Sequence, residues 1–107
     1  MKILLLCYGG MSTNLLVSSI MQAAKKQNFN CEVRASAASL VEEIASQYDV
    51  ILIAPQIRHK LATIRETTTT YNKPVALIPP DIYGQIQGDK ALAFAQQLLK
   101  SNETSEV

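Results

Sequence analysis

The sequence is poor in residues that mark several classes of protein. Its 107 residues include no tryptophan, one histidine, two cysteines and only 6% aromatic residues. Two cysteines are too few for a secreted disulfide scaffold, so both are expected to be reduced thiols. One histidine and two widely spaced cysteines also give no zinc-site pattern, and we expect neither a metal nor a cofactor.

Strong charge and long apolar runs are missing as well. The formal net charge is +1, and the lysines and arginines are scattered without interleaved aromatic residues. This pattern argues against binding to nucleic acid. No apolar run approaches the roughly 20 residues that span a bilayer, and the opening apolar run is too short for a signal peptide. A cytoplasmic protein is therefore expected.

What the sequence does contain is an alternation of apolar runs with segments of helical period. Hydrophobic residues make up 48%, which suits one small domain with its own core. Strands are predicted at residues 2–6, 31–35, 49–54 and 74–78. Helices are predicted at residues 14–27, 39–47, 56–67 and 89–100. The first helix should bury one face, formed by Leu16, Val17, Ile20, Met21 and Ala24.

Several local signals refine these boundaries. Ser39 stands three residues before Glu42, the spacing of a capping box at a helix start. Four threonines at 67–70 are poor helix formers and predict a frayed helix end or a surface turn. Residues 79–88 are predicted as a loop, after which Asp89 can cap the last helix.

The order of these elements predicts an α/β fold with three layers, α/β/α. A four-stranded, open, parallel sheet of flavodoxin-like type, with strand order 2-1-3-4, is favoured by right-handed crossovers. Ligands bind such sheets beyond the carboxyl ends of the strands, at the switch point between the first and third strands. Cys7 ends the first strand and so lies at this point. The exits of the third strand (54–56) and of the fourth (79–84) should line the same crevice.

The residues after Cys7 can form an anion-binding loop. Gly9 and Gly10 allow a sharp turn that points successive N–H groups at one place. The following helix adds unpaired N–H groups and the positive end of its dipole, and Ser12 and Thr13 add hydroxyls. A phosphate-sized dianion fits this description, and the same field favours the thiolate form of Cys7. The alternative is that Cys7 is only a small buried hydrophobe at the end of a strand.

The kind of phosphate chemistry is narrowed by what the loop lacks. No lysine follows Gly10 as a Walker A loop requires, and the chain has no GxGxxG. Low-molecular-weight tyrosine phosphatases, whose fold is similar to the predicted one, place a Cys-x5-Arg loop at this junction. Here the count from Cys7 reaches Thr13 instead of arginine. Without a guanidinium clamp, the loop suits holding a phosphoryl group better than hydrolysing it.

Three motifs carry a resemblance to a known family. The segment that ends the first strand reads Cys7-Tyr8-Gly9-Gly10-Met11-Ser12-Thr13-Asn14-Leu15-Leu16. The third strand ends in Ala54-Pro55-Gln56-Ile57, and the fourth leads into Tyr83-Gly84. In these motifs, and in size and element order over residues 2–100, the sequence resembles the IIB components of the lactose/cellobiose (N,N'-diacetylchitobiose) branch of the bacterial sugar phosphotransferase system.

The resemblance implies a phosphoryl carrier. Phosphate would pass from a phosphohistidine on a IIA protein to Cys7, and from this phosphocysteine to a beta-disaccharide of the cellobiose or chitobiose type. The sugar would be held by the membrane-embedded IIC transporter, with which the chain would associate. The protein would then be a phosphohistidine–sugar phosphotransferase, with a IIB domain at 1–102 and a flexible tail at 103–107. The resemblance assigns phosphate binding to Tyr8, Gly9, Gly10, Met11, Ser12, Thr13 and Asn14.

For other residues near the crevice, the sequence leaves more than one role open. Gln56 should point across the crevice toward the Cys7 loop. Asp81 is either a turn residue or the general acid of a phosphatase. Tyr83 either covers the phosphate pocket or packs its ring over the sheet end. His59 is expected to be solvated, and Cys31 is expected to be structural.

Two further possibilities stay open at this point. Met11 and Ile57 are either core residues or part of a docking face for the IIA protein. As a whole, the chain is alternatively a low-molecular-weight thiol phosphatase, or a non-catalytic anion-binding or redox-sensing module in which Cys7 is reversibly oxidised.

Overall fold

A four-stranded parallel sheet organises the chain. The computed structural model describes residues 1–7 and 11–105. The strand order is β2-β1-β3-β4, and all neighbouring strands are parallel. The strands are β1 (Lys2–Cys7), β2 (Glu32–Ala37), β3 (Val50–Ile53) and β4 (Val75–Leu77). The predicted fold class and the predicted strand order are therefore confirmed.

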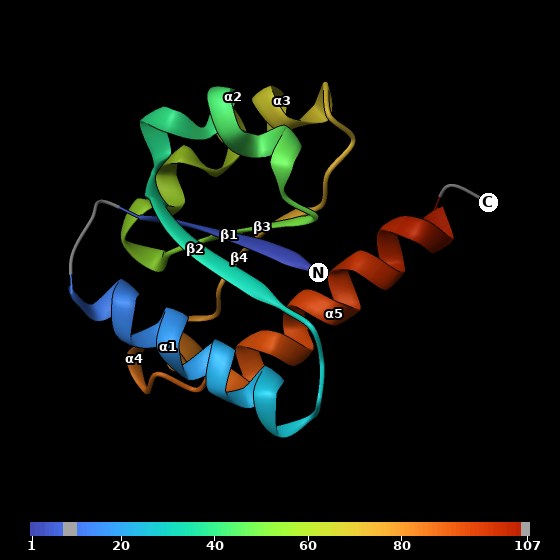
Figure 1. Ribbon diagram of the computed structural model, residues 1–107. Coiled ribbons are helices and arrows are strands. Elements are labelled where there is room, and N and C mark those ends of the chain that lie inside the picture. The colour runs from blue at the N-terminus through green and yellow to red at the C-terminus, as the bar shows by residue number, and fades with distance from the viewer. Residues whose placement is uncertain (8–10, 106–107) are drawn as a thin grey trace.

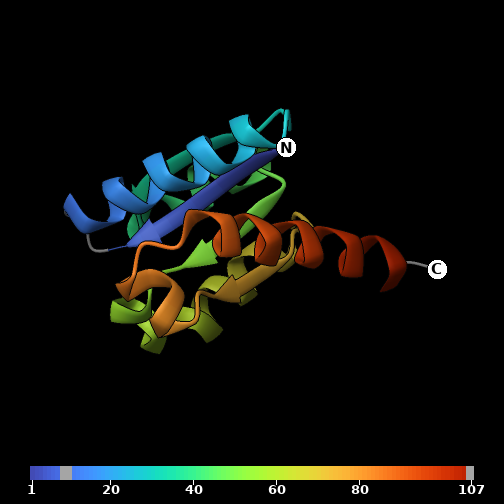
Figure 2. The same cartoon turned by 90° about the horizontal axis from the view of Figure 1, so that it is seen from below.

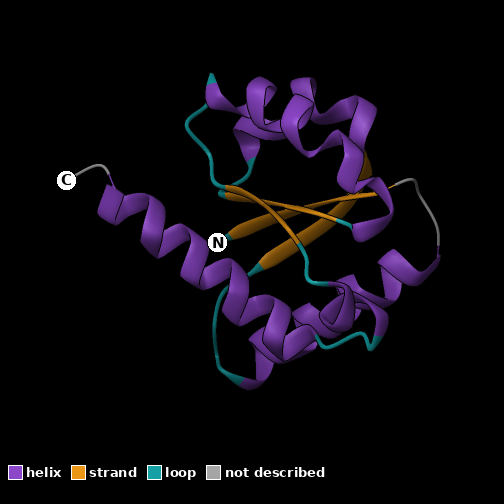
Figure 3. Cartoon of the chain, turned by 180° about the vertical axis from the view of Figure 1, so that it is seen from behind, coloured by secondary structure: helices purple, strands orange, loops and turns teal. Residues whose placement is uncertain are grey.

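Helices cover both faces of this sheet (Figure 1). One face carries α1 (Met11–Lys26), α4 (Pro80–Gly84) and α5 (Gly88–Ser105). The other carries α2 (Val41–Ile44), α3 (Leu61–Thr69) and the 3-10 segments η1 (Ala38–Leu40), η2 (Ala45–Gln47) and η3 (Pro55–Lys60). Seen from below, α1 and α5 lie side by side along the sheet (Figure 2). The strands form the middle of three layers (Figure 3).

The central strand β1 is buried on both faces. Ile3, Leu5 and Cys7 pack into the core on the side of α1 and α5. Leu4 and Leu6 pack into the second core on the side of α2 and α3. Successive side chains of a strand point to opposite faces, so a strand between two helical layers must be apolar at every position. Burial of each leucine or isoleucine contributes about 1.5–3 kcal/mol.

The helix α1 starts earlier than predicted and buries a narrower face. It begins at Met11 rather than near residue 14. Leu16, Ile20 and Ala24 are buried as expected, whereas 46% of Met21 is exposed. Each residue advances about 100° around a helix, which turns Met21 away from the face centred on Ile20. The prediction that Met21 is buried was therefore wrong.

The second helical segment differs from the prediction in its start. The sequence predicted one helix over 39–47 with a Ser39–Glu42 capping box. The chain instead forms η1, α2 and η2 in succession. Ser39 lies inside η1, whose N-cap is Ala37 with no side-chain hydrogen bond. Ser39 has already entered the helical turn and so does not take the flanking position from which a capping side chain accepts a backbone N–H.

The third helical segment begins as a 3-10 helix. The sequence predicted a helix over 56–67. The chain forms η3 first, with a non-helical backbone at Ile57 (φ −116°, ψ 27°), and only then α3. This break turns Ile57, which is 1% exposed, into the core on the α2 and α3 side.

The threonine run forms the end of α3, and the helix extends two residues beyond the predicted boundary at residue 67. Residues 67–69 lie in the last turn of α3, and only Thr70 falls in the turn after it. Thr68 is fully buried, and its hydroxyl donates to the Arg65 carbonyl at 3.2 Å. The Thr69 hydroxyl donates to the same carbonyl at 2.7 Å. Bonds to carbonyls of the preceding turn satisfy these hydroxyls inside a helix, a possibility that helix propensity alone does not weigh.

The last predicted loop and helix were also corrected. Residues 79–88 contain α4, a five-residue helix that starts at Pro80. The final helix begins at Gly88 and extends to Ser105, beyond the predicted end near residue 100. Asp89 lies within the first turn of α5 and is not the residue before it.

A serine from α1 supports the start of α5 instead. The Gly88 N–H donates to the Ser19 hydroxyl oxygen at 3.0 Å, and that hydroxyl donates to the Ile86 carbonyl at 3.1 Å. A Cβ placed on Gly88 would collide with the backbone and side chain of Ser19. The absence of a side chain at Gly88 is therefore what lets α5 approach α1 this closely.

Replacing Gly88 with alanine should destabilise the protein by about 1–3 kcal/mol, because the added methyl group overpacks the α1–α5 contact. The midpoint and slope of urea unfolding measure this change. Gly84→Ala is the matched control, since a Cβ there would meet nothing within 4 Å. Equal stability of the two variants would contradict the packing role of Gly88.

Candidate functional site

The candidate site lies at the carboxyl edge of the sheet, where β1 ends in Cys7. The Cys7 side chain is 5% exposed. Cys7 is in register with Ala37 of β2, and its Sγ donates to the Ser36 carbonyl at 3.9 Å, within the range for sulfur. The helix α1 starts at Met11, only four residues later. The predicted placement of a thiol between a central strand and a helix start is therefore seen in the structure.

Backbone hydrogen bonds hold the neighbouring strand exits at the same edge. The Ala54 N–H donates to the Leu6 carbonyl at 2.9 Å. The Ile78 N–H donates to the Ile53 carbonyl, also at 2.9 Å. Because the strands are parallel, the segments that follow β3 and β4 both leave from the edge where β1 ends. These segments carry the predicted crevice residues.

The predicted phosphate loop is described only in part. Tyr8, Gly9 and Gly10 lie outside the described residues. Met11, Ser12 and Thr13 form the start of α1, and their side chains also lie outside the description. Asn14 follows them and is exposed. The first turn of α1 contains no acidic residue, so no carboxylate offsets the positive end of this 16-residue helix.

Tyr83 belongs to the core that underlies the site. It is 8% exposed and packs in the same cluster as Cys7, Ala54 and Ile78. Of its two predicted roles, the structure supports packing over the end of the sheet. Tyr83 is thereby part of the apolar wall against which Cys7 is placed.

Gln56 and Asp81 are both exposed, on different elements. Gln56 is in η3, two residues after the Ala54 N–H that bonds to β1. Asp81 is in the first turn of α4, with its backbone carbonyl accepting from the Gln85 N–H at 3.1 Å. Asp81 is thus a helix residue and not a loop residue as predicted. Contact of either side chain with the Cys7 loop stays a prediction.

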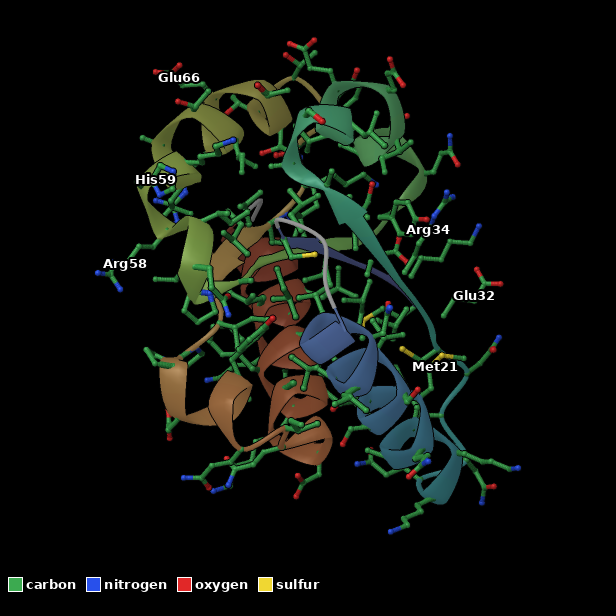
Figure 4. All side chains as sticks on the ribbon, turned by 90° about the vertical axis from the view of Figure 1, so that its left-hand side faces the viewer. Met21, Glu32, Arg34, Arg58, His59 and Glu66 are labelled. Carbon is green, nitrogen blue, oxygen red and sulfur yellow. The ribbon has the colours of Figure 1, made fainter. Side chains whose placement is uncertain are left out.

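The 3-10 segment η3 ends in consecutive basic residues. Arg58, His59 and Lys60 are all exposed, and Arg58 and His59 point outward from it (Figure 4). His59 is therefore solvated, as the sequence predicted. Ile57 is a core residue, so it does not belong to a docking face. The side chain of Met11, the other apolar residue considered for docking, lies outside the described residues.

Cys31 is remote from this edge. It precedes β2, whose first residue pairs with Lys2 at the amino end of β1, which places it about 20 Å from Cys7 along the strands. Its Sγ donates to the Glu32 carbonyl at 3.9 Å. Burial raises the pKa of the Cys31 thiol, Glu32 adds to the rise, and the charged N-terminus opposes it. Cys31 should therefore stay protonated and unreactive near neutral pH.

In 1–7 and 11–105, no three His, Cys, Asp or Glu side chains gather in a way that could hold a metal ion. Over the same residues, no helix is both long enough and apolar enough to cross a membrane.

The fold and this edge define a class: a small parallel α/β domain whose central strand ends in a cysteine four residues before a helix begins. Residues 2–94 match the family model described as "PTS system, Lactose/Cellobiose specific IIB subunit". The chain therefore belongs to the lactose/cellobiose IIB family of the sugar phosphotransferase system.

Relatives and solved structures agree with this assignment. The chain is 33% identical over 98 residues to the oligo-beta-mannoside-specific EIIB component of Bacillus subtilis, covering 92% of this chain and 95% of that one. It is 30% identical over 102 residues to the galactose-specific EIIB component of Lactococcus lactis, covering 91% and 94%. The solution structure of a cellobiose-specific IIB protein from Borrelia burgdorferi superimposes with a TM-score of 0.81 at 35% identity, covering 95% and 94%.

A more distant relative is much longer. The lactose-specific EIICB component of Lactococcus lactis is 26% identical over 98 residues, which are 90% of this chain but 17% of that protein. In that protein, a region similar to this chain is part of a larger polypeptide named for both IIC and IIB.

Cys31 should react slowly with a thiol reagent. In a Cys7→Ser variant, we expect iodoacetamide at about pH 8 to alkylate Cys31 at least about threefold more slowly in the folded protein than in urea, because burial reduces the thiolate fraction. The rate should rise with pH, since the reactive species is the thiolate. Mass spectrometry follows the reaction, and equal rates in both states would contradict the assignment.

Proposed function

We propose that Cys7 carries a phosphoryl group from a phosphohistidine on a IIA protein to a sugar bound by a IIC transporter. The observation that carries the proposal is the position of Cys7 in a IIB family member. The residue ends the central strand, four residues before the start of α1, whose first turn lacks acidic residues. A dianion beside such a helix start is stabilised by unpaired N–H groups and by the helix dipole.

In the first step, the thiolate of Cys7 attacks the phosphorus of the phosphohistidine. The S–P bond forms while the P–N bond breaks, and the electron pair of that bond leaves with the imidazole nitrogen of the donor. Backbone N–H groups at the start of α1 stabilise the negative charge spread over the phosphoryl oxygens in the transition state. The product is a phosphocysteine on this chain and an unphosphorylated IIA protein.

In the second step, a sugar hydroxyl attacks the same phosphorus. The O–P bond forms, the S–P bond breaks and its electron pair returns to sulfur, while a base of the transporter takes the hydroxyl proton. A thiolate is a good leaving group for this step. The N–H groups at the start of α1 stabilise the phosphoryl oxygens in this step as they do in the first.

The site is better suited to carrying phosphate than to hydrolysing it. A phosphatase of related fold would clamp the phosphoryl group with an arginine at position 13, where this chain has Thr13. Asp81, the candidate general acid, is exposed in α4 and follows β4, which is separated from β1 by β3.

The partners and the location follow from the same relay. The EIICB relative joins a IIB-like region and a IIC region in one polypeptide, which supports a IIC partner for this chain. Two of the similar proteins are named for cellobiose and for oligo-beta-mannoside, which supports a beta-linked disaccharide as the proposed class of substrate. A cytoplasmic position, with docking to the membrane through IIC, would let one chain meet both partners.

Cys7→Ser should lower phosphoryl transfer to sugar by on the order of 10³-fold or more, because a protonated hydroxyl replaces the nucleophile. Intact-mass analysis after incubation with a phosphorylated IIA protein measures uptake of one phosphoryl group. Cys31→Ser is the matched control and should retain uptake within about twofold, since Cys31 lies at the opposite edge.

Two results would overturn the carrier role. One is sugar phosphorylation by Cys7→Ser at the wild-type rate. The other is wild-type protein that gains no phosphoryl group from the donor but forms a reversible oxidation product at Cys7, as a redox sensor would. Unfolding curves of both serine variants show whether a loss of transfer is a loss of fold.

A further inference from the structure

A serine in the middle of α1 bonds to the junction between α4 and α5. The Ser19 hydroxyl donates to the Ile86 carbonyl at 3.1 Å and accepts from the Gly88 N–H at 3.0 Å. A serine within a helix more often faces solvent or bonds to a carbonyl of its own preceding turn. Ser19 instead uses its hydrogen and a lone pair on residues 67 and 69 positions away. These two bonds, which we call the Ser19 latch, tie α1 to the junction.

The junction holds the accepting carbonyl in a fixed direction. Ile86 has a φ of 53°, in the left-handed region that β-branched residues rarely occupy. It stands where α4 ends in a capping turn, the position that glycine usually takes. The Ile86 N–H donates to the Tyr83 carbonyl at 3.2 Å. The next N–H, of Gln87, donates to the Ile82 carbonyl at 3.0 Å. Such a conformation persists where surrounding bonds hold it in place, as these bonds do.

The junction is itself connected to the strand that ends in Cys7. Backbone hydrogen bonds join the exit of β3 to β1, and the exit of β4 to β3. The helix α4 begins at Pro80, directly after the exit of β4, and leads into the junction. The Ser19 latch then connects this path to α1. The helix α1 is thus connected to β1 twice, once along the chain from Cys7 to Met11 and once through β3, β4 and α4.

Apolar packing is less specific about where α1 lies along its own axis. Ile20 and Ala24 of α1 share one buried cluster with Leu92 and Ala95 of α5, and the two helices lie side by side (Figure 2). Such packing is non-directional. A pocket of about 310 Å³, lined in part by Ser19, also lies between α1 and the start of α5. Hydrogen bonds require a defined distance and angle, so the Ser19 latch fixes the axial position of α1.

From these observations we propose that Ser19 is a positioning residue for phosphoryl transfer, whose two hydrogen bonds hold the first turn of α1 where its N–H groups meet the phosphoryl group on Cys7. The inference rests on the proposed function. Ser19 lies about 12 Å along the helix axis from Met11, and the helix carries an axial shift to its first turn. A displacement of about 1 Å at a reacting group is enough to lower a rate by up to about 100-fold.

The test is the variant Ser19→Ala, which removes both bonds of the latch. The Gly88 N–H also donates to the Ile86 carbonyl at 3.1 Å, so the junction keeps an internal bond and the variant should fold. The donor is the lactose/cellobiose-class IIA protein from the same organism, phosphorylated on histidine. Rapid-quench sampling and intact-mass analysis give the rate of uptake at Cys7 as a function of donor concentration.

The limiting rate at saturating donor should fall about tenfold in Ser19→Ala, because the N–H groups no longer meet the phosphoryl oxygens in the transition state. The donor concentration that gives half of this rate should stay within about twofold of the wild-type value, since the substitution is away from the carboxyl edge of the sheet. A loss of folded protein alone would lower the amplitude of uptake and not its limiting rate.

Two variants of the same helix are the controls. Ser18→Ala makes the same substitution at the exposed neighbouring residue and should leave both quantities within about twofold of the wild type. Ala23→Gly weakens α1 without removing the latch, because glycine is a poor helix former. It should lower the midpoint of urea unfolding and leave the limiting rate within about twofold of the wild type.

Amide resonances give a structural measurement that does not depend on the donor. In Ser19→Ala, the ¹H–¹⁵N resonances of residues 11–14 should shift, because the first turn of α1 changes its place relative to the sheet. In Ser18→Ala and Ala23→Gly, the resonances of these residues should stay at their wild-type positions.

Four results would overturn the proposal. A folded Ser19→Ala variant with the wild-type limiting rate would remove the positioning role and leave the carrier function intact. An equal fall in Ala23→Gly would show that the rate follows helix stability and not the latch. A higher half-saturating donor concentration with an unchanged limiting rate would assign Ser19 to donor binding. Wild-type protein that takes up no phosphoryl group would remove the proposed function, and the positioning role with it.

Discussion

Burial of the central strand between two helical layers is the constraint on which the rest of the structure depends. β1 contributes side chains to both cores, and its neighbours β2 and β3 pair with it over most of its length. A strand held in this way has little freedom at its end. Cys7 is therefore fixed in position by hydrophobic packing. Its reactivity then depends on the residues that follow it in the chain. The stability of the core and the placement of the sulfur have one cause.

The same sheet also brings the other parts of the site together. Backbone bonds from Ala54 to Leu6 and from Ile78 to Ile53 bring the exits of β3 and β4 to the edge where β1 ends. The family assignment connects this edge with phosphoryl transfer, since IIB proteins belong to a sugar phosphotransferase system. In the proposed relay, one edge must receive two partners in turn.

The sequence was sufficient for the features that depend on apolar pattern. Continuous runs identified β1 and β3, and their position at the centre of a 2-1-3-4 sheet followed. It was insufficient where tertiary contacts decide local structure. Thr68 is helical because its hydroxyl is satisfied within the helix and its side chain is buried, and α5 starts at Gly88 because Ser19 of α1 accepts its N–H. Arg58, His59 and Lys60 are consecutive in the sequence, but only the structure shows that all three are exposed at the end of η3.

The alternation along β1 carries a consequence for how this chain can vary. Cys7 shares its orientation with Ile3 and Leu5, toward the layer that contains α1. Insertion or deletion of a single residue within the strand would turn the Cys7 side chain to the other face of the sheet. The sulfur would then point into the layer that contains α2 and α3, away from α1. Length changes in descendants of this sequence should therefore accumulate in the connections at the amino edge, while the number of residues in the first strand stays the same. The length of the first strand therefore decides which face of the sheet the Cys7 side chain points to, because side chains alternate with a period of two residues.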